Sequence, residues 1–247
     1  MLSFHQFDHN FCESTIYSDG PHPEYFNAFS SLFITFIGLN ALRKPHLSIF
    51  LSIMYSCLSV NGVLSFLYHY YNSIGYGLLD RMSMILLGLS TSYNLYTTSK
   101  RHFQISFYGN ILIHLCMISF YSFLLTVAGL HNEVLFNALF TGFLGSIVIY
   151  IYAIEKYVEK RIIAFGWKGV RYIFASAIFW ITTEGLCGHL PFIKYLFGHV
   201  FWHVFVSYGG YCVSIVPHYI LLSKYNEKIE IYNDVFGIPY LEYDDIV

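Results

Sequence analysis

The sequence predicts an all-α integral membrane protein, a bundle of seven transmembrane helices, from its composition, its charge-free stretches and the charges of its loops. Of its 247 residues, 56% are apolar and 11% are charged, against roughly 45–50% and about 25% in soluble domains. So few charged groups cannot solvate the surface of a water-soluble fold. The 13 basic and 15 acidic residues also argue against a nucleic-acid binder, which needs a basic surface.

Seven charge-free apolar stretches define the predicted helices. A bilayer core of about 30 Å needs about 20 mostly apolar residues. We therefore expect spans at Phe26–Leu42, Leu47–Tyr70, Leu78–Ser99, Phe103–Ala128, Leu135–Ile154, Val170–Cys187 and Tyr195–Ser223. Together they make residues 26–223 one transmembrane domain, flanked by an acidic N-terminal tail at 1–25 and an acidic C-terminal tail at 224–247. No cleavable signal peptide precedes the first span, so we expect that span to be retained.

Basic residues predict the orientation of the bundle. One end of the seven-helix arrangement receives Arg43, Lys44, Lys100, Arg101, Lys156, Lys160, Arg161, Lys168, Arg171, Lys224 and Lys228, whereas the loops at the other end receive Lys194. Basic residues near helix ends stay in the cytoplasm. We therefore expect a lumenal or extracellular N-terminus and a solvated cytoplasmic C-terminus, in the endoplasmic reticulum, the Golgi or the plasma membrane.

Polar and ionisable residues gather at one predicted depth of the bundle. Ser65 and His69 lie late in the second span, Asp80 lies at the start of the third, and His199 and His203 lie at the start of the seventh. Because the second span runs outward and the other two run inward, all five reach the outer or lumenal end. Each i, i+4 pair also projects from one helix face. Such residues are costly in a membrane and usually face a cavity or a partner.

These five residues have the composition of a hydrolytic zinc site. Three imidazoles and a water form an open zinc shell, and a carboxylate and a hydroxyl beside it supply what amide hydrolysis needs. Taken singly, each histidine fits a hydrogen-bonded structural role better. Asp80 also fits the orientation of a zinc-bound histidine, and Ser65 fits a cap of its own helix. The convergence of all five at one depth favours the zinc site.

The spacing of these residues resembles that of the alkaline ceramidase family, part of a larger group of seven-helix membrane hydrolases that includes the adiponectin and progestin receptors. The segments that carry the resemblance are Ser65-Phe-Leu-Tyr-His69, Leu78-Leu-Asp80 and Gly-His199-Val-Phe-Trp-His203. The resemblance implies that His69, His199 and His203 bind zinc, with Ser65 and Asp80 as catalytic residues beside it.

The activity implied by this resemblance is that of an N-acylsphingosine amidohydrolase, which cleaves ceramide from the bilayer into sphingosine and a free fatty acid. Zinc would lower the pKa of its bound water toward about 7, and Asp80 would take the proton before attack on the amide carbonyl. Ser65 and zinc would share the oxyanion. Two alternatives stay open. One is a related membrane lipid hydrolase acting on another amide or an ester, and the other is a seven-helix receptor or transporter with structural zinc.

The sequence departs from the family at two places beside the expected site. The family tends to have Glu-Leu-Pro after the aspartate, where Arg81-Met-Ser83 follows Asp80 here. It favours an aspartate late in the sixth helix, where this chain has Thr183 followed by Glu184. Neither departure replaces a proposed zinc ligand, but both alter the surroundings of Asp80 or the approach of substrate.

The N-terminal tail carries a second resemblance, in Asn10-Phe-Cys12-Glu13-Ser-Thr15 and Glu24-Tyr-Phe-Asn27. In the family, an acidic Asp-Trp-Cys-Glu-Glu-Asn segment binds calcium together with a later glutamate. The resemblance implies a weak calcium site here, because fewer charged oxygen ligands remain; the alternative is an acidic tail without an ion. Its expected ligands are Asn10, Phe11, Glu13, Thr15 and Glu24.

The same resemblance implies a disulfide bond. In the family, the cysteine of the acidic segment is linked to a cysteine of the sixth helix, which corresponds to Cys12 and Cys187 here. An oxidising lumen permits such a bond. Two free thiols are the alternative.

Overall fold

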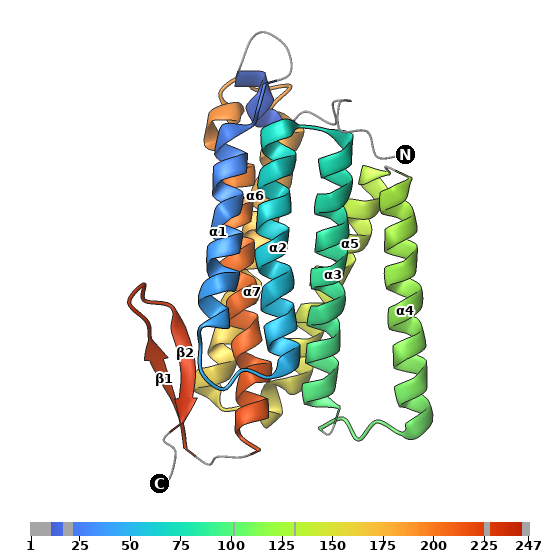
Figure 1. The fold of residues 1–247 in the computed structure, drawn as a ribbon, viewed down its shortest axis with the longest axis vertical. Helices are drawn as coiled ribbons and strands as arrows, with labels where there is room; N and C mark the ends of the chain where they lie inside the picture. The colour runs from blue at the N-terminus through green and yellow to red at the C-terminus, as the bar shows by residue number, and fades with distance from the viewer. Residues whose placement is uncertain (1–10, 17–21, 101, 131, 225–227, 244–247) are drawn as a thin grey trace.

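Seven long helices form one bundle in the computed structural model, which describes residues 11–16, 22–100, 102–130, 132–224 and 228–243 (Figure 1). Helix α7 packs against α6 and α1, and α2 packs against α1 and α3, while α4 and α5 complete the far side. The prediction of an all-α bundle is confirmed. The long helices are α1 (Tyr25–Leu42), α2 (Ile49–Tyr71), α3 (Ile74–Ser99), α4 (Phe107–Gly129), α5 (Glu133–Ile154), α6 (Lys160–Leu186) and α7 (Gly198–Leu222). The 3-10 helices are η1 (Cys12–Ile16), η2 (Glu155–Tyr157) and η3 (Ile193–Leu196).

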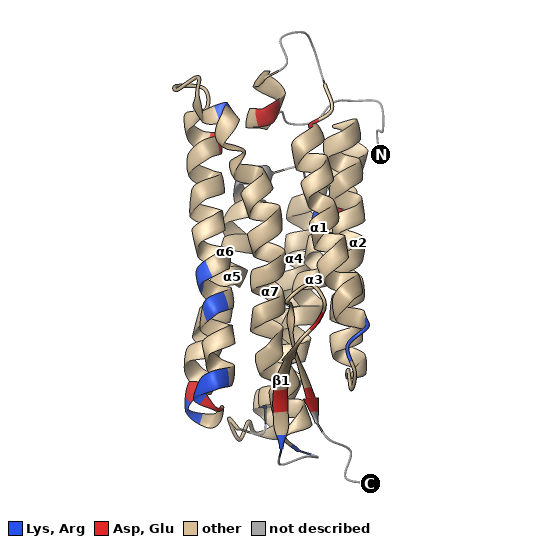
Figure 2. Ribbon diagram, turned by 90° about the vertical axis from the view of Figure 1, so that its left-hand side faces the viewer, with Lys and Arg blue, Asp and Glu red and all other residues tan. Residues whose placement is uncertain are grey.

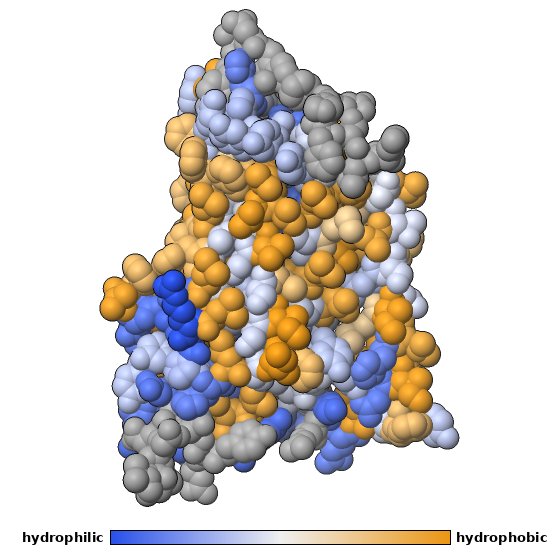
Figure 3. Space-filling view, viewed as in Figure 1, coloured by the Kyte–Doolittle hydropathy of each residue, from blue (hydrophilic) through white to orange (hydrophobic). Residues whose placement is uncertain are grey.

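Six of these helices are long and apolar enough to cross a membrane. Helix α3 has the length but is more polar, since its buried face includes Asp80, Arg81 and Asn94. Apolar side chains cover the middle of the visible face (Figure 3). Lys and Arg lie mainly in the half of the bundle farther from η1 (Figure 2). These features are those of a multi-pass membrane protein, with η1 and the C-terminal segment at opposite ends (Figure 1).

Some helix boundaries differ from the predicted ones. Helix α6 begins at Lys160 rather than Val170, because a helix continues through lysines and arginines whose long side chains reach the interface. Helix α7 begins at Gly198 rather than Tyr195, because Phe197 adopts a left-handed conformation with φ 49° and separates it from η3. A search for charge-free stretches detects neither kind of boundary.

Glycines allow two helix pairs to pack backbone against backbone. A Cβ added to Gly209 of α7 would lie 2.8 Å from the carbonyl oxygen of Gly169 in α6, and a Cβ at Gly62 of α2 would lie 2.8 Å from the carbonyl oxygen of Ser31 in α1. Small residues permit such close approach in membranes. The helix pairs α6–α7 and α1–α2, which hold the candidate site described below, therefore pack closely.

Residues 229–243 form a β-hairpin, where the sequence predicted a solvated acidic tail. Strand β1 (Ile229–Asn233) pairs antiparallel with β2 (Pro239–Tyr243), and the connection contains Gly237 at φ 73°. Ile229, Ile238 and Leu241 are buried against the bundle. Burial of these apolar residues explains why the segment folds onto the bundle. The acidic composition of the segment does not indicate this.

Asp234 anchors the hairpin to the α1–α2 connection. Its carboxylate accepts hydrogen bonds from Lys44, from Asn40 (2.7 Å) and from the backbone N–H groups of Phe236 and Ile238 (both 2.9 Å). Burial raises the pKa of Asp234, but these hydrogen bonds outweigh it and lower the pKa to about 2. The stabilisation is therefore complete above the ordinary pKa near 4 and is lost as the pH falls toward 2.

We expect Asp234→Ala to loosen the hairpin and to lower the free energy of unfolding by about 1–3 kcal/mol, because Lys44 loses its charged acceptor. Limited proteolysis should then cut residues 229–243 faster than in the unmodified protein. Glu230→Ala is the matched control, since the Glu230 side chain is 47% exposed and contacts Lys228 alone among the ion pairs of the described residues. Equal cleavage of both variants would show that Asp234 does not anchor the hairpin.

Candidate metal centre

Three buried histidines meet at the η1 end of the bundle. His69 lies in the last turn of α2, and His199 and His203 lie in the first two turns of α7. Their ring centroids are 4.5–5.2 Å apart, and one nitrogen from each lies within 4.8 Å of the other two. The structure thus brings together the three residues predicted to bind zinc, in a group that could hold a metal ion.

Two features of the backbone bring the histidines and Asp80 to the same end of the bundle. A Cβ at Gly198 would overlap the side chain of Thr183 in α6, so only glycine lets α7 begin this close to α6. His199 follows directly. Helix α2 ends at Tyr71, and the left-handed conformation of Asn72 (φ 45°) turns the chain at once into α3. His69 and Asp80 therefore stay at the same end of the bundle.

Hydrogen bonds orient the rings of His69 and His203. His69 Nδ1 is 2.7 Å from Glu24 Oε2, and both side chains are buried. His203 Nδ1 is 2.9 Å from Ser30 Oγ and 3.3 Å from Ser31 Oγ. With Nδ1 engaged, Nε2 of each ring remains as the metal-binding atom. A carboxylate bonded to a ligating histidine is a regular feature of zinc sites, so the residues fit zinc.

We expect Glu24→Gln to weaken zinc binding about 10- to 100-fold, because partners of this kind orient the ligand and raise its basicity. Competition with a chelator of known affinity measures the effect directly. Glu155→Gln is the control, since Glu155 is exposed in η2 at the opposite end of the bundle. An unchanged affinity in Glu24→Gln would show that Glu24 does not support the metal.

Asp80 and Ser65 line the same cavity as the three histidines. Asn61 Nδ2 donates to Asp80 Oδ1 (3.2 Å), which leaves the second carboxylate oxygen for another partner. Ser65 Oγ is 3.1 Å from Ser31 Oγ. Ser31 Oγ also donates to the carbonyl oxygen of Asn27 (2.8 Å), and a hydroxyl has a single proton to donate, so either serine can be the donor in the Ser31–Ser65 contact. The five residues predicted to lie at one depth of the bundle thus line one cavity. The catalytic roles of Asp80 and Ser65 stay predictions.

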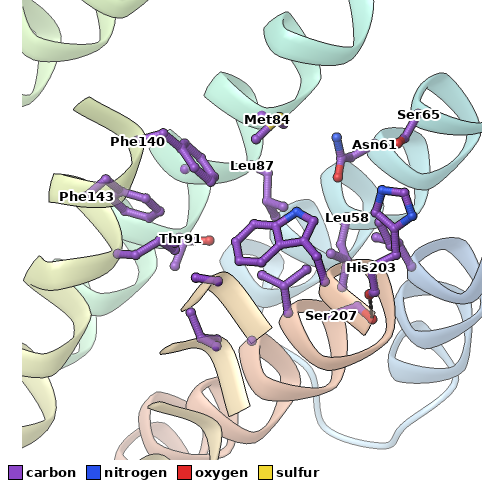
Figure 4. A pocket seen from close by; sticks show the side chains of 18 of the residues that line it. Leu58, Asn61, Ser65, Met84, Leu87, Thr91, Phe140, Phe143, His203 and Ser207 are labelled. Atoms are coloured by element: carbon purple, nitrogen blue, oxygen red, sulfur yellow. Dashed lines mark hydrogen bonds between the residues drawn. The ribbon is translucent and has the colours of Figure 1, made fainter. Parts of the chain in front are cut away.

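The cavity has a volume of about 380 Å³, within the usual range of roughly 300–1,000 Å³ for ligand pockets. In Figure 4, Asn61 and Ser65 lie beside His203, while Met84, Leu87 and Phe140 lie across the space. Arg81, which departs from the family pattern, is buried and also lines the wall. The wall away from the histidines is mostly apolar, which suits a hydrocarbon chain.

Cys12 and Cys187 lie beside Glu184. The two sulfurs and a carboxylate oxygen of Glu184 are within 4.8 Å of one another, and the backbone N–H of Cys12 donates to Glu184 Oε2 (2.7 Å). Burial and the thiol of Cys187 raise the pKa of the Cys12 thiol. Both cysteines are free thiols in the structure. Their proximity fits the disulfide that the resemblance implies, and the bond itself stays a prediction.

Peptide mapping without reductant should recover a Cys12–Cys187 linked peptide from protein made in an oxidising compartment. The bond would hold η1 to the end of α6, because it joins segments already in contact. Cys57 and Cys116 should remain alkylatable and serve as internal controls. Complete alkylation of Cys12 and Cys187 in the same sample would contradict the bond.

Glu13, an expected calcium ligand, has a structural role. Its two carboxylate oxygens accept hydrogen bonds from the backbone N–H groups of Phe26 and Asn27 (both 2.8 Å) and so cap the start of α1. Burial raises the pKa of Glu13 to about 7, against the opposing effect of these bonds. Carboxylate oxygens are prominent among calcium ligands, and both oxygens of Glu13 already accept backbone hydrogen bonds, so this setting does not favour calcium. Asn10 lies outside the described residues.

The other expected calcium ligands also have partners. Glu24 Oε1 accepts the backbone N–H of Phe11 (2.9 Å) while Oε2 bonds to His69, and Thr15 Oγ1 donates to the carbonyl oxygen of Cys12 (2.7 Å). Glu24 is thus tied to the histidine site. The calcium site stays a prediction that these contacts do not support.

The remaining membrane histidines lie apart from the group. His114 Nδ1 bonds to the carbonyl oxygen of Asn110 (2.7 Å), His218 Nε2 bonds to that of His46 (3.3 Å), and His189 lies in the turn after α6. Sequence reasoning missed Ser30, Ser31 and Asn61. A signal for Asn61 was present, because Asn61, Ser65 and His69 recur every four residues on α2 and form one polar helix face.

The six apolar helices make this a multi-pass membrane protein. The three buried histidines at one end of its apolar cavity form a candidate metal centre. The Ceramidase family model matches residues 5–242, nearly the whole chain. The chain therefore belongs to the Ceramidase family, and the resemblance noted in the sequence is confirmed. The family name indicates a hydrolase that acts on ceramide. No curated protein matches the chain significantly.

Proposed function

We propose that this protein is a zinc-dependent intramembrane amidase that hydrolyses ceramide to sphingosine and a free fatty acid. The observation that carries the proposal is the buried group of His69, His199 and His203 at one end of an apolar cavity, in a chain of the Ceramidase family. Such a cavity accepts a hydrocarbon chain. The amide then lies at the polar end, beside the histidines.

Zinc held by the three histidines would act as a Lewis acid that polarises the amide carbonyl and activates a water. The chain's own residues supply the rest. Asp80 is positioned by Asn61 to accept a proton from the attacking water and to return it to the departing amine. The Ser65 hydroxyl, which lines the same cavity, would donate to the oxyanion that develops on the carbonyl. The apolar wall excludes bulk water, which strengthens both contacts.

The test is fatty-acid release from ceramide by purified protein in detergent, with the metal content measured on the same sample. We expect release that stops when a chelator removes zinc and returns when zinc is added back. Intact ceramide after incubation with zinc-loaded protein would overturn the proposal. Turnover of a matched ester or another amide in that case would identify a related lipid hydrolase, and no turnover of any lipid would favour a receptor or transporter.

A further inference from the structure

Asn94 of α3 is a buried amide facing the cavity without a partner. Its side chain has 0% exposure, it lines the cavity, and neither Oδ1 nor Nδ2 has a hydrogen-bond partner among the described residues. The hydroxyl groups of Thr97 and Thr98 bond to its backbone oxygen and not to its side chain. A buried primary amide is unfavourable unless something bonds to it, and the open side is the cavity.

This amide lies far from the histidines. Asn94 follows Asp80 by 14 positions on α3, which is about 21 Å along a helix that rises 1.5 Å per residue. Tyr55 precedes His69 by 14 positions on α2, so it reaches a similar depth. Ser214 lies 11 positions beyond His203 on α7. All three line the cavity, whose far end therefore has polar groups from three helices.

The polar groups from α2 and α7 are already satisfied. Tyr55 Oη is 2.6 Å from Ser214 Oγ, and Ser214 Oγ donates to the carbonyl oxygen of Tyr211 (2.6 Å). Tyr211 Oη in turn donates to the carbonyl oxygen of Pro239 in β2 (2.5 Å). Asn94 differs from these neighbours, because its donor and its acceptor both remain for a ligand.

The distribution of charged residues along the cavity wall limits which chemical group can pair with Asn94. The charged residues of the cavity wall, Asp80, Arg81 and Glu184, lie at the histidine end. Among the described residues that line the far end, none carries a charge. A carboxylate or an ammonium group placed there would be buried without a counter-ion, which is strongly unfavourable. The group that pairs with Asn94 is therefore neutral and polar.

We propose that Asn94 forms a subsite for a hydroxyl group at the end of a hydrocarbon chain of the lipid substrate. An extended chain advances about 1.25 Å per carbon, since each C–C bond of about 1.5 Å is inclined to its axis. A chain of about 15–17 carbons then spans the distance from the amide to Asn94. A hydroxyl donates to Oδ1 or accepts from Nδ2, whereas a terminal methyl group leaves the amide unpaired.

This proposal rests on the proposed hydrolysis of ceramide, and the hydroxyl can belong to either chain of that lipid. The acyl chain and the sphingoid chain both start near the scissile amide. Three synthetic ceramides separate the sources: one with a plain 16-carbon acyl chain, one with a hydroxyl on the last acyl carbon, and one with a hydroxyl on the last sphingoid carbon. Their kcat/KM values are compared for the unmodified protein and for Asn94→Leu, which keeps the size of the side chain.

We expect one of the two hydroxylated ceramides to be preferred about tenfold over the plain one, and Asn94→Leu to abolish that preference. The matched control is Ser90→Ala, which removes a hydroxyl one turn away on α3 that bonds to the backbone of Leu87 and not to Asn94, and it should preserve the ratio. A ratio that is the same in the unmodified protein and in Asn94→Leu would overturn the subsite while leaving ceramide hydrolysis intact.

A binding measurement keeps the subsite testable without turnover. The zinc-loaded protein is titrated with hexadecanoic acid and with 16-hydroxyhexadecanoic acid, and with the plain and terminally hydroxylated sphingoid bases. We expect tighter binding of a hydroxylated ligand that is lost in Asn94→Leu. Equal binding within both pairs, together with equal kcat/KM values, would refute the subsite. Discrimination here without hydrolysis of any ceramide would instead refute the proposed function alone.

Discussion

Alanine at His69, His199 or His203 is expected to remove bound zinc and to reduce ceramide hydrolysis to background. Each change leaves two of the three ligands, and the apolar bundle around them offers no replacement imidazole among the described residues. The measurements are metal content and fatty-acid release on the same purified samples. Helix packing elsewhere does not depend on these side chains, so the variants should still insert and elute as folded protein.

His114→Ala is the matched control for this series. His114 is also a membrane histidine, but it bonds to the backbone of its own helix and lies apart from the group. We expect normal zinc content and normal turnover in this variant. Full zinc occupancy in all three variants of the group would remove the metal assignment and with it the proposed mechanism.

Asp80→Asn is expected to retain zinc and to lower kcat by about 10²–10⁴, the usual contribution of a general base. The substitution keeps the size of the side chain and can still contact Asn61, so the position stays filled while proton acceptance is lost. KM should change little, because Asp80 acts on the water rather than on the hydrocarbon chain. Glu230→Gln, an equivalent change on an exposed strand, should have no effect. A kcat close to normal would make Asp80 a structural residue.

The helices and the histidine group could be predicted because both depend on depth in the membrane. Charge-free length fixes where a helix crosses, and a position along the helix then fixes depth. His69, His199 and His203 follow from that reasoning, although they are far apart in sequence. Depth alone does not say which side chains face each other. The partnership of Glu24 with His69 depends on how α1 and α2 pack, so Glu24 was assigned to calcium by motif.

The hairpin could not be predicted for a different reason. Its strands are five residues each, too short for a strong periodic pattern, and they lie in a segment rich in acidic residues. Their order comes from contacts with distant residues, such as Lys44 with Asp234 and Tyr211 with Pro239. Asn94 was missed for a similar reason, because an amide inside a span is notable only when its neighbours are known to be satisfied.

The hairpin also has a consequence for the order of events during synthesis. Tyr211 lines the cavity, and its hydroxyl group is held by the carbonyl oxygen of Pro239. All three histidines leave the ribosome before residue 239 does. The hydroxyl group of Tyr211 therefore has no acceptor in β2 until the hairpin has been made. Premature termination after α7 would therefore give a chain that has all three histidines but in which Tyr211, a residue of the cavity wall, lacks its acceptor in β2.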